Sequence, residues 1–307
     1  MKISIATSTF SVNSNKPIEI IEKYTNQINF NPYSRILNET ELLTLASNAD
    51  GIIAGNEQYS QTMINNLPNL KVISRLGVGL DNIDNNYAKQ KGIKVFKNNI
   101  TPGPAVAELV IGLMIDISRR ISQSDQLMRS GNWKKHMGSL LQGKTLGIIG
   151  LGTIGKELVK LTNGFELKIL AYDKNEDANF AQNHDIIYCD LKSLLSDSDF
   201  ISIHLNLSES TKNIIDEQKI ELMKPEAILI NTSRGQIINE NSLYNALKSK
   251  KLAGAALDVF VKEPYVGELL ELENIVLTPH IGSYAKEIRI KMEIEAAENL
   301  IRGLNER

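Results

Sequence analysis

The segment from Thr145 to Asp173 constrains the fold more than any other part of the chain. The apolar run Thr145 to Ile149 has strand character, and the glycine-rich turn Gly150-Leu-Gly152-Thr-Ile-Gly155 follows at once. A helix-like segment then leads into a second apolar run that ends at Asp173. This order of strand, turn, helix and strand is typical of a dinucleotide-binding βαβ unit. The sequence therefore predicts that a dinucleotide binds at this turn.

The glycines and the aspartate of this segment each suit a different part of a bound dinucleotide. Gly150 permits a sharp turn, Gly152 lets the backbone approach a pyrophosphate, and Gly155 lets the helix pack closely on the strand. The N–H groups at the helix N-terminus can then bind the phosphates. Asp173 can accept hydrogen bonds from both ribose hydroxyls, and its charge would repel a 2′-phosphate. We therefore expect NAD rather than NADP as the cofactor.

Length and composition exclude several classes of protein. The chain has 307 residues, enough for two domains with separate cores, and its net charge of −2 favours neither nucleic acid nor an anionic membrane as a partner. No apolar run is long enough to span a bilayer, and the N-terminus lacks a signal-peptide pattern. The single cysteine, Cys189, excludes an intrachain disulfide, and the histidines show no metal-ligand spacing. These features predict a cytoplasmic protein without a metal.

Short apolar runs alternate with helical segments along the whole chain, which predicts an α/β fold with mostly parallel sheets. Because the glycine-rich turn lies so far from the N-terminus, a separate unit must precede the cofactor domain. The segment Asn98 to Pro104 is the expected first crossing between the units, and the second is expected near His280. The predicted architecture is two Rossmann-like domains with doubly wound parallel sheets. The cofactor domain, residues 99–283, is inserted into a discontinuous substrate domain, residues 1–98 and 284–307.

The expected strands and the two longest expected helices can be named from their apolar patterns. The strands are Ile3–Ala6, Gly51–Ala54, Val72–Arg75, Lys94–Phe96, Thr145–Ile149, Leu167–Tyr172, Ile186–Tyr188, Phe200–His204, Ala227–Asn231, Gly254–Leu257 and Ile275–Leu277. One helix, Ala105–Ile121, is apolar around much of its circumference and is expected to be buried on more than one side. The other, Ala285–Leu304, is amphipathic and charged.

Three polar motifs, NTSRG, DVFVKEP and TPHIGS, follow late strands. Open α/β sheets bind their ligands at these strand ends. An arginine followed by glycine, as at Arg234, is poorly explained there by packing. Glu263 is held extended by the proline that follows it, although an ordinary exposed loop would look the same. A lone histidine such as His280 is more often structural than catalytic.

These motifs resemble those of the D-isomer-specific 2-hydroxyacid dehydrogenases in order and spacing, over essentially the whole chain. The phosphoglycerate dehydrogenase and hydroxypyruvate or glyoxylate reductase group is the most similar. The resemblance implies that Arg234, Glu263 and His280 are the catalytic residues. Protonated His280 would give a proton to the carbonyl oxygen while NADH gives the hydride, with Glu263 orienting the imidazolium. Arg234 would bind the carboxylate and polarise the carbonyl.

The resemblance also implies substrate and cofactor contacts. Backbone N–H groups around Gly77, Val78 and Gly79 would hold the substrate carboxylate, which suits a glycine-rich loop. Arg75 matches an arginine near the far end of phosphoglycerate-type substrates, but it could instead form an interdomain ion pair. The implied cofactor ligands are Gly150, Gly152, Thr153, Ile154, Gly155, Asp173, Leu205, Asn206, Thr211, Thr232, Asp258, His280 and Gly282.

The chain departs from the family pattern at three places. Asn206 stands where relatives commonly have proline, the segment Ile100–Ala105 is shorter than usual, and SYAKE follows Gly282. These differences could reshape the substrate pocket. The segment Ala105–Glu108 matches the start of the family's dimer-contacting helix, so the resemblance implies a homodimer.

Together these observations predict an NAD-dependent D-2-hydroxyacid dehydrogenase that resembles phosphoglycerate dehydrogenase. Arg75 and the basic cluster Lys134-Lys135-His136 could bind a phosphate, although a solvated loop would contain the same residues. A hydroxypyruvate or glyoxylate reductase is the alternative. An NAD(H)-sensing protein similar to corepressors is the alternative from another class. Another oxidoreductase on the same scaffold, such as a formate or phosphonate dehydrogenase, is a further alternative. Formate is disfavoured, because formate dehydrogenases of this type have glutamine where this chain has Glu263.

Overall fold

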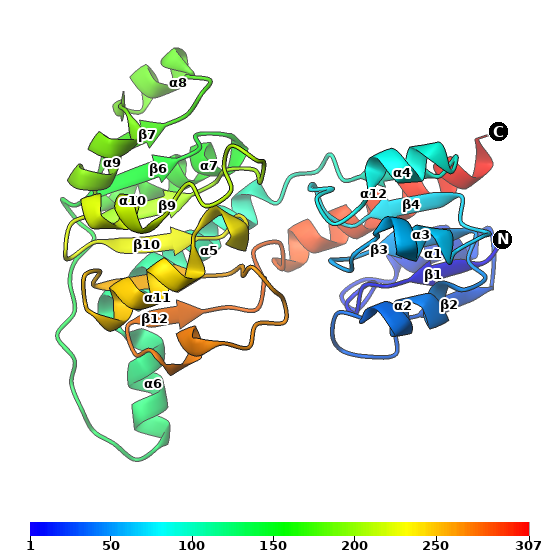
Figure 1. The fold of residues 1–307 in the computed structure, drawn as a ribbon, viewed down its shortest axis with the longest axis horizontal. Coiled ribbons are helices and arrows are strands. Elements are labelled where there is room, and N and C mark those ends of the chain that lie inside the picture. The colour runs from blue at the N-terminus through cyan, green and yellow to red at the C-terminus, as the bar shows by residue number, and fades with distance from the viewer. Residues whose placement is uncertain (307) are drawn as a thin grey trace. The chain divides into compact units, whose positions relative to one another are not determined.

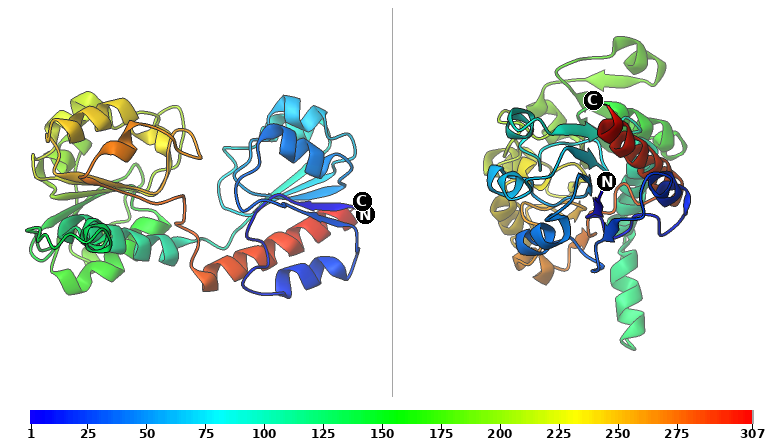
Figure 2. Two further views of the ribbon diagram at one scale, coloured as in Figure 1. Left: turned by 90° about the horizontal axis from the view of Figure 1, so that it is seen from below. Right: turned by 90° about the vertical axis from the view of Figure 1, so that its right-hand side faces the viewer.

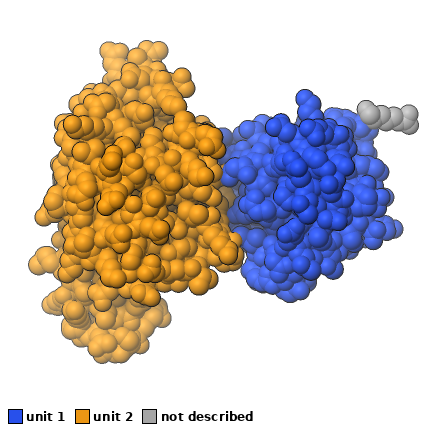
Figure 3. Space-filling view, in the orientation of Figure 1, with its two compact units in different colours: residues 1–101, 284–307 blue, residues 102–283 orange. Residues whose placement is uncertain are grey.

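The computed structural model describes residues 1–306, which form two compact units (Figure 3). Unit 1 contains residues 1–101 and the chain from residue 284 onward, and unit 2 contains residues 102–283. The first crossing therefore follows Thr101, within the expected segment Asn98 to Pro104 and three residues after the expected domain boundary at residue 98. The physical reason is that Glu295, near the C-terminus, binds the backbone N–H groups of Asn99 and Ile100 and keeps them with unit 1.

The core of unit 1 is a five-stranded parallel sheet in the order β2-β1-β3-β4-β5. The three central strands are buried along their whole length, which explains why they are mostly apolar. The edge strand β2 was not predicted, because its three residues are at least partly exposed and carry no apolar pattern. The strands are β1 (Ile3–Ile5), β2 (Ile28–Phe30), β3 (Gly51–Ala54), β4 (Val72–Arg75) and β5 (Lys94–Lys97).

Helices cover both faces of this sheet (Figure 2). On one face, α12 and α1 pack through Met292, Ala296 and Ile21 against the strands. On the other face, α2, α3 and α4 enclose a second cluster that includes Leu42 and Met63. The helices are α1 (Lys16–Glu22), α2 (Glu39–Ala46), α3 (Gln61–Asn65), α4 (Asn85–Gln90) and α12 (Lys286–Asn305).

Unit 2 is built on a seven-stranded parallel sheet in the order β12-β11-β10-β9-β6-β7-β8 (Figure 1). The chain starts in the middle with β6, builds one side through β7 and β8, and then builds the other side from β9 onward. Such a reversal leaves a crevice at the carboxyl ends of β6 and β9, where this fold binds ligands. The strands are β6 (Thr145–Ile149), β7 (Lys168–Tyr172), β8 (Ile186–Tyr188), β9 (Phe200–Ile203), β10 (Ile228–Asn231), β11 (Gly254–Leu257) and β12 (Ile275–Leu277).

Two helical layers enclose the sheet of unit 2. One apolar cluster lies under α5 and α7, and a second lies under α9, α10 and α11. The predicted α/β architecture, with two doubly wound parallel sheets, is therefore confirmed. The helices are α5 (Gly103–Arg119), α6 (Ile121–Arg129), α7 (Thr153–Thr162), α8 (Ala178–Asn183), α9 (Leu191–Asp197), α10 (Glu217–Leu222) and α11 (Glu240–Lys248), with short 3-10 turns η1 (Asn163–Phe165), η2 (Gly235–Ile237) and η3 (Glu268–Glu271).

The predicted helix from Ala105 to Ile121 is interrupted near its end. Arg120 adopts a left-handed conformation with φ of 52°, so α5 stops at Arg119 and α6 starts in a new direction. No residue of α6 is buried, and the helix projects away from the sheet of unit 2 (Figure 1). Within residues 1–306, no helix is long and apolar enough to cross a membrane.

The segment that leaves unit 1 is held by one carboxylate of α12. Glu295 accepts hydrogen bonds from the N–H groups of Asn99 and Ile100, at 2.9 and 3.0 Å, and from the side-chain amide of Asn98 at 3.0 Å. Asn98 in turn bonds to Gly77 in the loop after β4. Glu295 therefore fixes both the exit of the chain and one end of that loop.

Replacing Glu295 with alanine is expected to lower the free energy of unfolding of unit 1 by about 2 kcal/mol, because several charge-assisted hydrogen bonds are lost at once. The measurement is the urea midpoint followed by circular dichroism. Glu298→Ala, an exposed glutamate of the same helix, is the matched control. Equal midpoints for the two variants would contradict the anchoring role.

Candidate active site

The glycine-rich turn lies at the carboxyl end of β6, and two of its glycines are required by the fold. Gly150 has a φ of 97°, and a Cβ atom there would lie 2.8 Å from the carbonyl oxygen of His204. A Cβ atom on Gly155 would lie 2.7 Å from the carbonyl oxygen of Gly150, so α7 can approach β6 only with glycine at this position. Gly152 differs, because nothing lies within 4 Å of its Cβ position. The N-terminus of α7 is therefore open to a ligand on that side.

Asp173, at the end of β7, is held in place by backbone amides. One carboxylate oxygen accepts a hydrogen bond from Leu151 N at 2.8 Å, and the other accepts one from Asn175 N at 2.9 Å. These bonds join the end of β7 to the glycine-rich turn. They fix a negative charge beside the turn, where the ribose of a dinucleotide would lie.

Two buried polar atoms at the ends of β9 and β10 have no hydrogen-bond partner within residues 1–306: Nδ1 of His204 and Oγ1 of Thr232. His204 bonds through Nε2 to Ser202 Oγ at 2.9 Å, and burial lowers its pKa to about 4, which keeps the ring neutral. Buried polar groups usually have a partner, so such atoms beside an open turn indicate a ligand or water. Together with the space at Gly152, these atoms fit a dinucleotide.

Other predicted cofactor ligands make bonds within their own loop. The hydroxyl of Thr211 donates to the carbonyl oxygen of Asn206 at 2.7 Å and accepts from Ser208 N at 2.8 Å. Thr211 therefore closes a turn that starts at Asn206.

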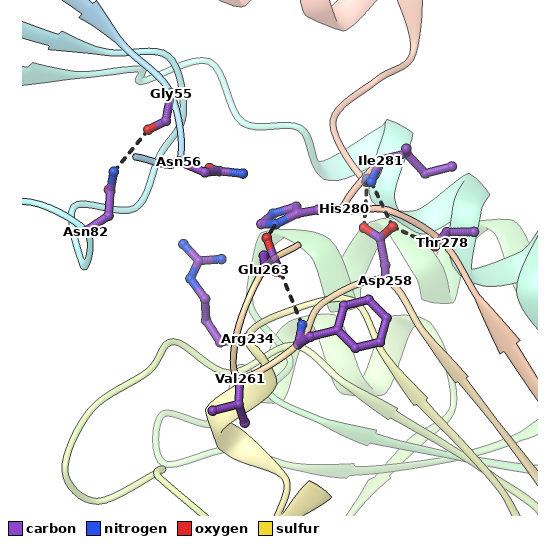
Figure 4. Close-up of polar contacts among 12 residues, drawn as sticks. Gly55, Asn56, Asn82, Arg234, Asp258, Val261, Glu263, Thr278, His280 and Ile281 are labelled. Atoms are coloured by element: carbon purple, nitrogen blue, oxygen red, sulfur yellow. Dashed lines mark hydrogen bonds and ion pairs between the residues drawn. The ribbon is translucent and has the colours of Figure 1, made fainter. Parts of the chain in front are cut away.

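His280 and Glu263, 17 residues apart in the chain, form a close pair (Figure 4). Nδ1 of His280 lies 2.7 Å from Oε2 of Glu263, and Oε1 of the same carboxylate accepts a hydrogen bond from Phe260 N at 3.1 Å. A carboxylate at one ring nitrogen stabilises the protonated imidazole and fixes its orientation. The other nitrogen, Nε2, is thereby directed away from Glu263. This geometry suits a group that gives or takes a proton.

Asp258 fastens the loop that carries His280. Its side chain is 0% exposed, and it accepts hydrogen bonds from Thr278 Oγ1 at 2.6 Å, Ile281 N at 2.7 Å and Gly282 N at 2.8 Å. Burial raises the pKa of Asp258, while these bonds and His280 act in the opposite direction. From the sequence, Asp258 and Gly282 were expected to bind the cofactor separately. The sequence did not indicate that Gly282 N donates a hydrogen bond to Asp258.

Arg234 follows β10 and precedes η2. The guanidinium of Arg234 donates to the carbonyl oxygen of Ser233 at 2.8 Å. The side-chain amide of Asn231 donates to the carbonyl oxygen of Arg234 at 2.9 Å. Figure 4 shows the guanidinium directed toward the Glu263–His280 pair. Unit 2 thus brings the three residues implied as catalytic to the carboxyl ends of neighbouring strands.

In unit 1, the loop after β4 presents backbone donors. Gly77 N bonds to Asn98 Oδ1 at 2.8 Å, whereas no hydrogen bond within residues 1–306 uses the N–H groups of Val78 and Gly79. Neighbouring N–H groups without acceptors in an exposed, glycine-rich loop form a site suited to an anion.

Arg75 precedes this loop and is only 8% exposed. Its guanidinium bonds to Asn56 Oδ1 at 2.6 Å, to Asn82 Oδ1 at 3.3 Å and to the carbonyl oxygen of Leu76. Asn82 also donates to the carbonyl oxygen of Gly55 at 3.0 Å (Figure 4). Arg75 therefore joins the loops after β3 and β4 inside unit 1. The sequence gave no indication of the roles of Asn56 and Asn82, because single asparagines in loops carry no pattern.

Known proteins share this arrangement of motifs and fold. Residues 111–282 match the family "D-isomer specific 2-hydroxyacid dehydrogenase, NAD binding domain". A glyoxylate reductase of Thermococcus litoralis is 43% identical over 80% of this chain and 77% of its own length. A hydroxypyruvate reductase of Thermotoga maritima is 38% identical over 96% of this chain and 98% of its own. The crystal structure of a phosphoglycerate oxidoreductase from Vibrio cholerae superposes with a TM-score of 0.88 at 26% identity, covering 98% of each chain.

Replacing Gly155 with alanine is expected to weaken NADH binding by about tenfold and to lower thermal stability by about 1–3 kcal/mol, since α7 must move away from the turn. Binding can be measured by quenching of protein fluorescence. Gly164→Ala is the control, because nothing lies within 4 Å of its Cβ position. An unchanged NADH affinity in the Gly155 variant would show that close packing of α7 is not required.

Proposed function

This chain belongs to the D-isomer specific 2-hydroxyacid dehydrogenase family, and we propose that it reduces a small, unphosphorylated 2-oxo acid, as a hydroxypyruvate or glyoxylate reductase does. It is an NAD-dependent oxidoreductase of this family. We further propose that unit 2 binds NAD through the turn at Gly150 and that unit 1 binds the substrate carboxylate. The observation that supports the choice of substrate is the burial of Arg75.

The Glu263–His280 pair supports the proposed chemistry. When bound, NADH supplies the hydride for the carbonyl carbon of the substrate. Nε2 of protonated His280 donates a proton to the carbonyl oxygen, and Glu263 stabilises the charged ring before that transfer. Arg234 pairs with the substrate carboxylate through its planar guanidinium. In the reverse direction, neutral His280 accepts the hydroxyl proton.

The buried position of Arg75 favours a substrate without a phosphate. Its bonds to Asn56, Asn82 and Leu76 hold the guanidinium inside unit 1. A phosphate dianion binds best to accessible cationic donors, and reaching Arg75 would cost these bonds. The N–H groups of Val78 and Gly79 suit the carboxylate that both classes of substrate carry, so the choice between the classes rests on Arg75. The preference for a phosphoglycerate-type substrate, as the sequence suggested it, therefore has less support than its alternative.

The segment with the second group expected to bind a phosphate leads to the amino ends of the strands of unit 2, opposite the predicted catalytic residues. The segment with Lys134, Lys135 and His136 leads to Ser139, which bonds to the carbonyl oxygen of Ser118 near the end of α5. Met137 and Gly138 line a groove together with residues at the amino ends of β9 and β10. Arg234 and His280 follow the carboxyl ends of strands in the same sheet. Lys134 and Lys135 are therefore not proposed as phosphate ligands.

We expect NADH oxidation to be faster with hydroxypyruvate or glyoxylate than with 3-phosphohydroxypyruvate, by about tenfold or more in kcat/KM. His280→Ala is expected to lower turnover by about 10²- to 10⁴-fold while NADH still binds. The measurement is NADH absorbance under steady-state conditions. A preference for the phosphorylated substrate would restore the phosphoglycerate dehydrogenase hypothesis. Tight NADH binding without turnover of any 2-oxo acid would favour the NAD(H)-sensing alternative.

We also propose that the protein is a homodimer that pairs through α6 and the segment after it. Large apolar side chains are unusually exposed there, with Trp133 80% and Met137 95% exposed. Clustered exposed apolar groups of this kind mark association surfaces. A second copy of the chain would cover them. The cytoplasmic location stays a prediction from the sequence.

The double variant Trp133→Asp with Met137→Asp is expected to be monomeric by analytical ultracentrifugation, because two charges would have to be buried in the contact. Val266→Asp is the matched control, since Val266 is 90% exposed in a different part of unit 2. A dimer that persists in the double variant would place the contact elsewhere.

A further inference from the structure

The residues that follow Arg234 fold directly against the loop that carries Glu263. Gly235 starts η2, and a Cβ atom there would overlap the peptide between Phe260 and Val261. The contact is with backbone atoms, which cannot rotate away as a side chain could. The backbone at Gly235 therefore packs directly against the peptide between Phe260 and Val261.

Two side chains from the same segment bind the backbone of Val261. Glu240, the first residue of α11, accepts a hydrogen bond from Val261 N at 2.6 Å. Gln236 donates to the carbonyl oxygen of Val261 at 3.3 Å, a longer and weaker bond. The side chain of Val261 is half-exposed and contributes little packing of its own (Figure 4). Glu240 therefore holds the backbone of the loop, together with Phe260, whose side chain is buried in the apolar core.

The backbone of this loop also contacts the Glu263–His280 pair. Phe260, the neighbour of Val261, donates its N–H to Oε1 of Glu263, and Oε2 of Glu263 binds His280. Glu240 itself makes no hydrogen bond to either of these two side chains. Its contribution would therefore pass through the backbone of Phe260 and Val261.

We propose that Glu240 is a positioning residue, which holds the loop of Glu263 so that Glu263 orients His280 for proton transfer. The inference rests on the proposed roles of Glu263 and His280. It assigns to Glu240 no contact with substrate or cofactor.

The charge environment agrees with this geometry. Burial raises the pKa of Glu240, the bond from Val261 N lowers it, and the neighbouring charge of Glu263 raises it again. Tyr265 is the other titratable group beside Glu240, and its own pKa is raised by burial and by Glu240. On the other side of the pair, His280 faces Asp258 as well as Glu263. Keeping two carboxylates together in a half-buried place is unfavourable, and the hydrogen bond to Val261 offsets that cost.

Glu240→Ala is expected to lower kcat by about 10- to 100-fold, because a small displacement of a catalytic group is costly. The KM for the 2-oxo acid and the affinity for NADH should change little. Glu240→Gln keeps an oxygen acceptor for Val261 N and should restore most of the lost kcat.

Glu217→Ala is the matched control, since Glu217 is the first residue of α10 but is exposed. Glu240→Asp serves as a second variant if the alanine protein does not fold. It keeps a carboxylate at the start of α11 but draws it back from Val261 N, so kcat should fall as in the alanine variant.

His280→Ala and Glu263→Gln are measured in parallel. They distinguish a wrong role for the Glu263–His280 pair from a wrong role for Glu240. If both retain wild-type turnover, the proposed roles of the pair are wrong. If both lose turnover while Glu240→Ala or Glu240→Asp keeps the wild-type kcat, the positioning role of Glu240 is overturned.

Discussion

The arrangement of unit 2 around its candidate site depends on one hydrogen bond, between Nδ1 of His280 and Oε2 of Glu263. Both residues stand on irregular loops beyond the sheet, so no strand fixes their distance of 2.7 Å. Asp258 secures the loop of His280 from one side. Glu240 secures the loop of Glu263 from the other. Carboxylates therefore bind the backbone on both sides of the pair: Asp258 binds Ile281 and Gly282, and Glu240 binds Val261.

Carboxylates replace the missing secondary structure in these loops. Buried N–H groups need acceptors, and loops beyond the strand ends have lost their sheet partners. Asp258 accepts from Ile281 and Gly282, while Glu263 accepts from Phe260. Charge-assisted bonds of this kind are stronger than neutral ones, so they can hold a loop in a single position.

The sequence predicted what local patterns determine. Buried parallel strands are mostly apolar, and the turn at Gly150 must have glycine at fixed positions, so both were recognisable. The edge strand β2 was missed because it is short and partly exposed, and the break at Arg120 was missed because arginine is an ordinary helix residue. The partners of Asp258 lie more than 20 residues away, and only the order of the strands brings them together. The sequence likewise could not show whether the segment with Lys134 leads to the amino ends or the carboxyl ends of the strands.

Arg75 shows why a matching residue type does not settle a substrate. The arginine that resembles a phosphate ligand is buried at the end of β4 and joins two loops through Asn56 and Asn82. Buried guanidinium groups need such partners, because an unpaired charge would be costly there. The donors left at the loop surface are then the neutral N–H groups of Val78 and Gly79. These donors suit the carboxylate that phosphorylated and unphosphorylated 2-oxo acids share, so they do not distinguish the two classes. The burial of one arginine thus favours a small 2-oxo acid over a phosphorylated one.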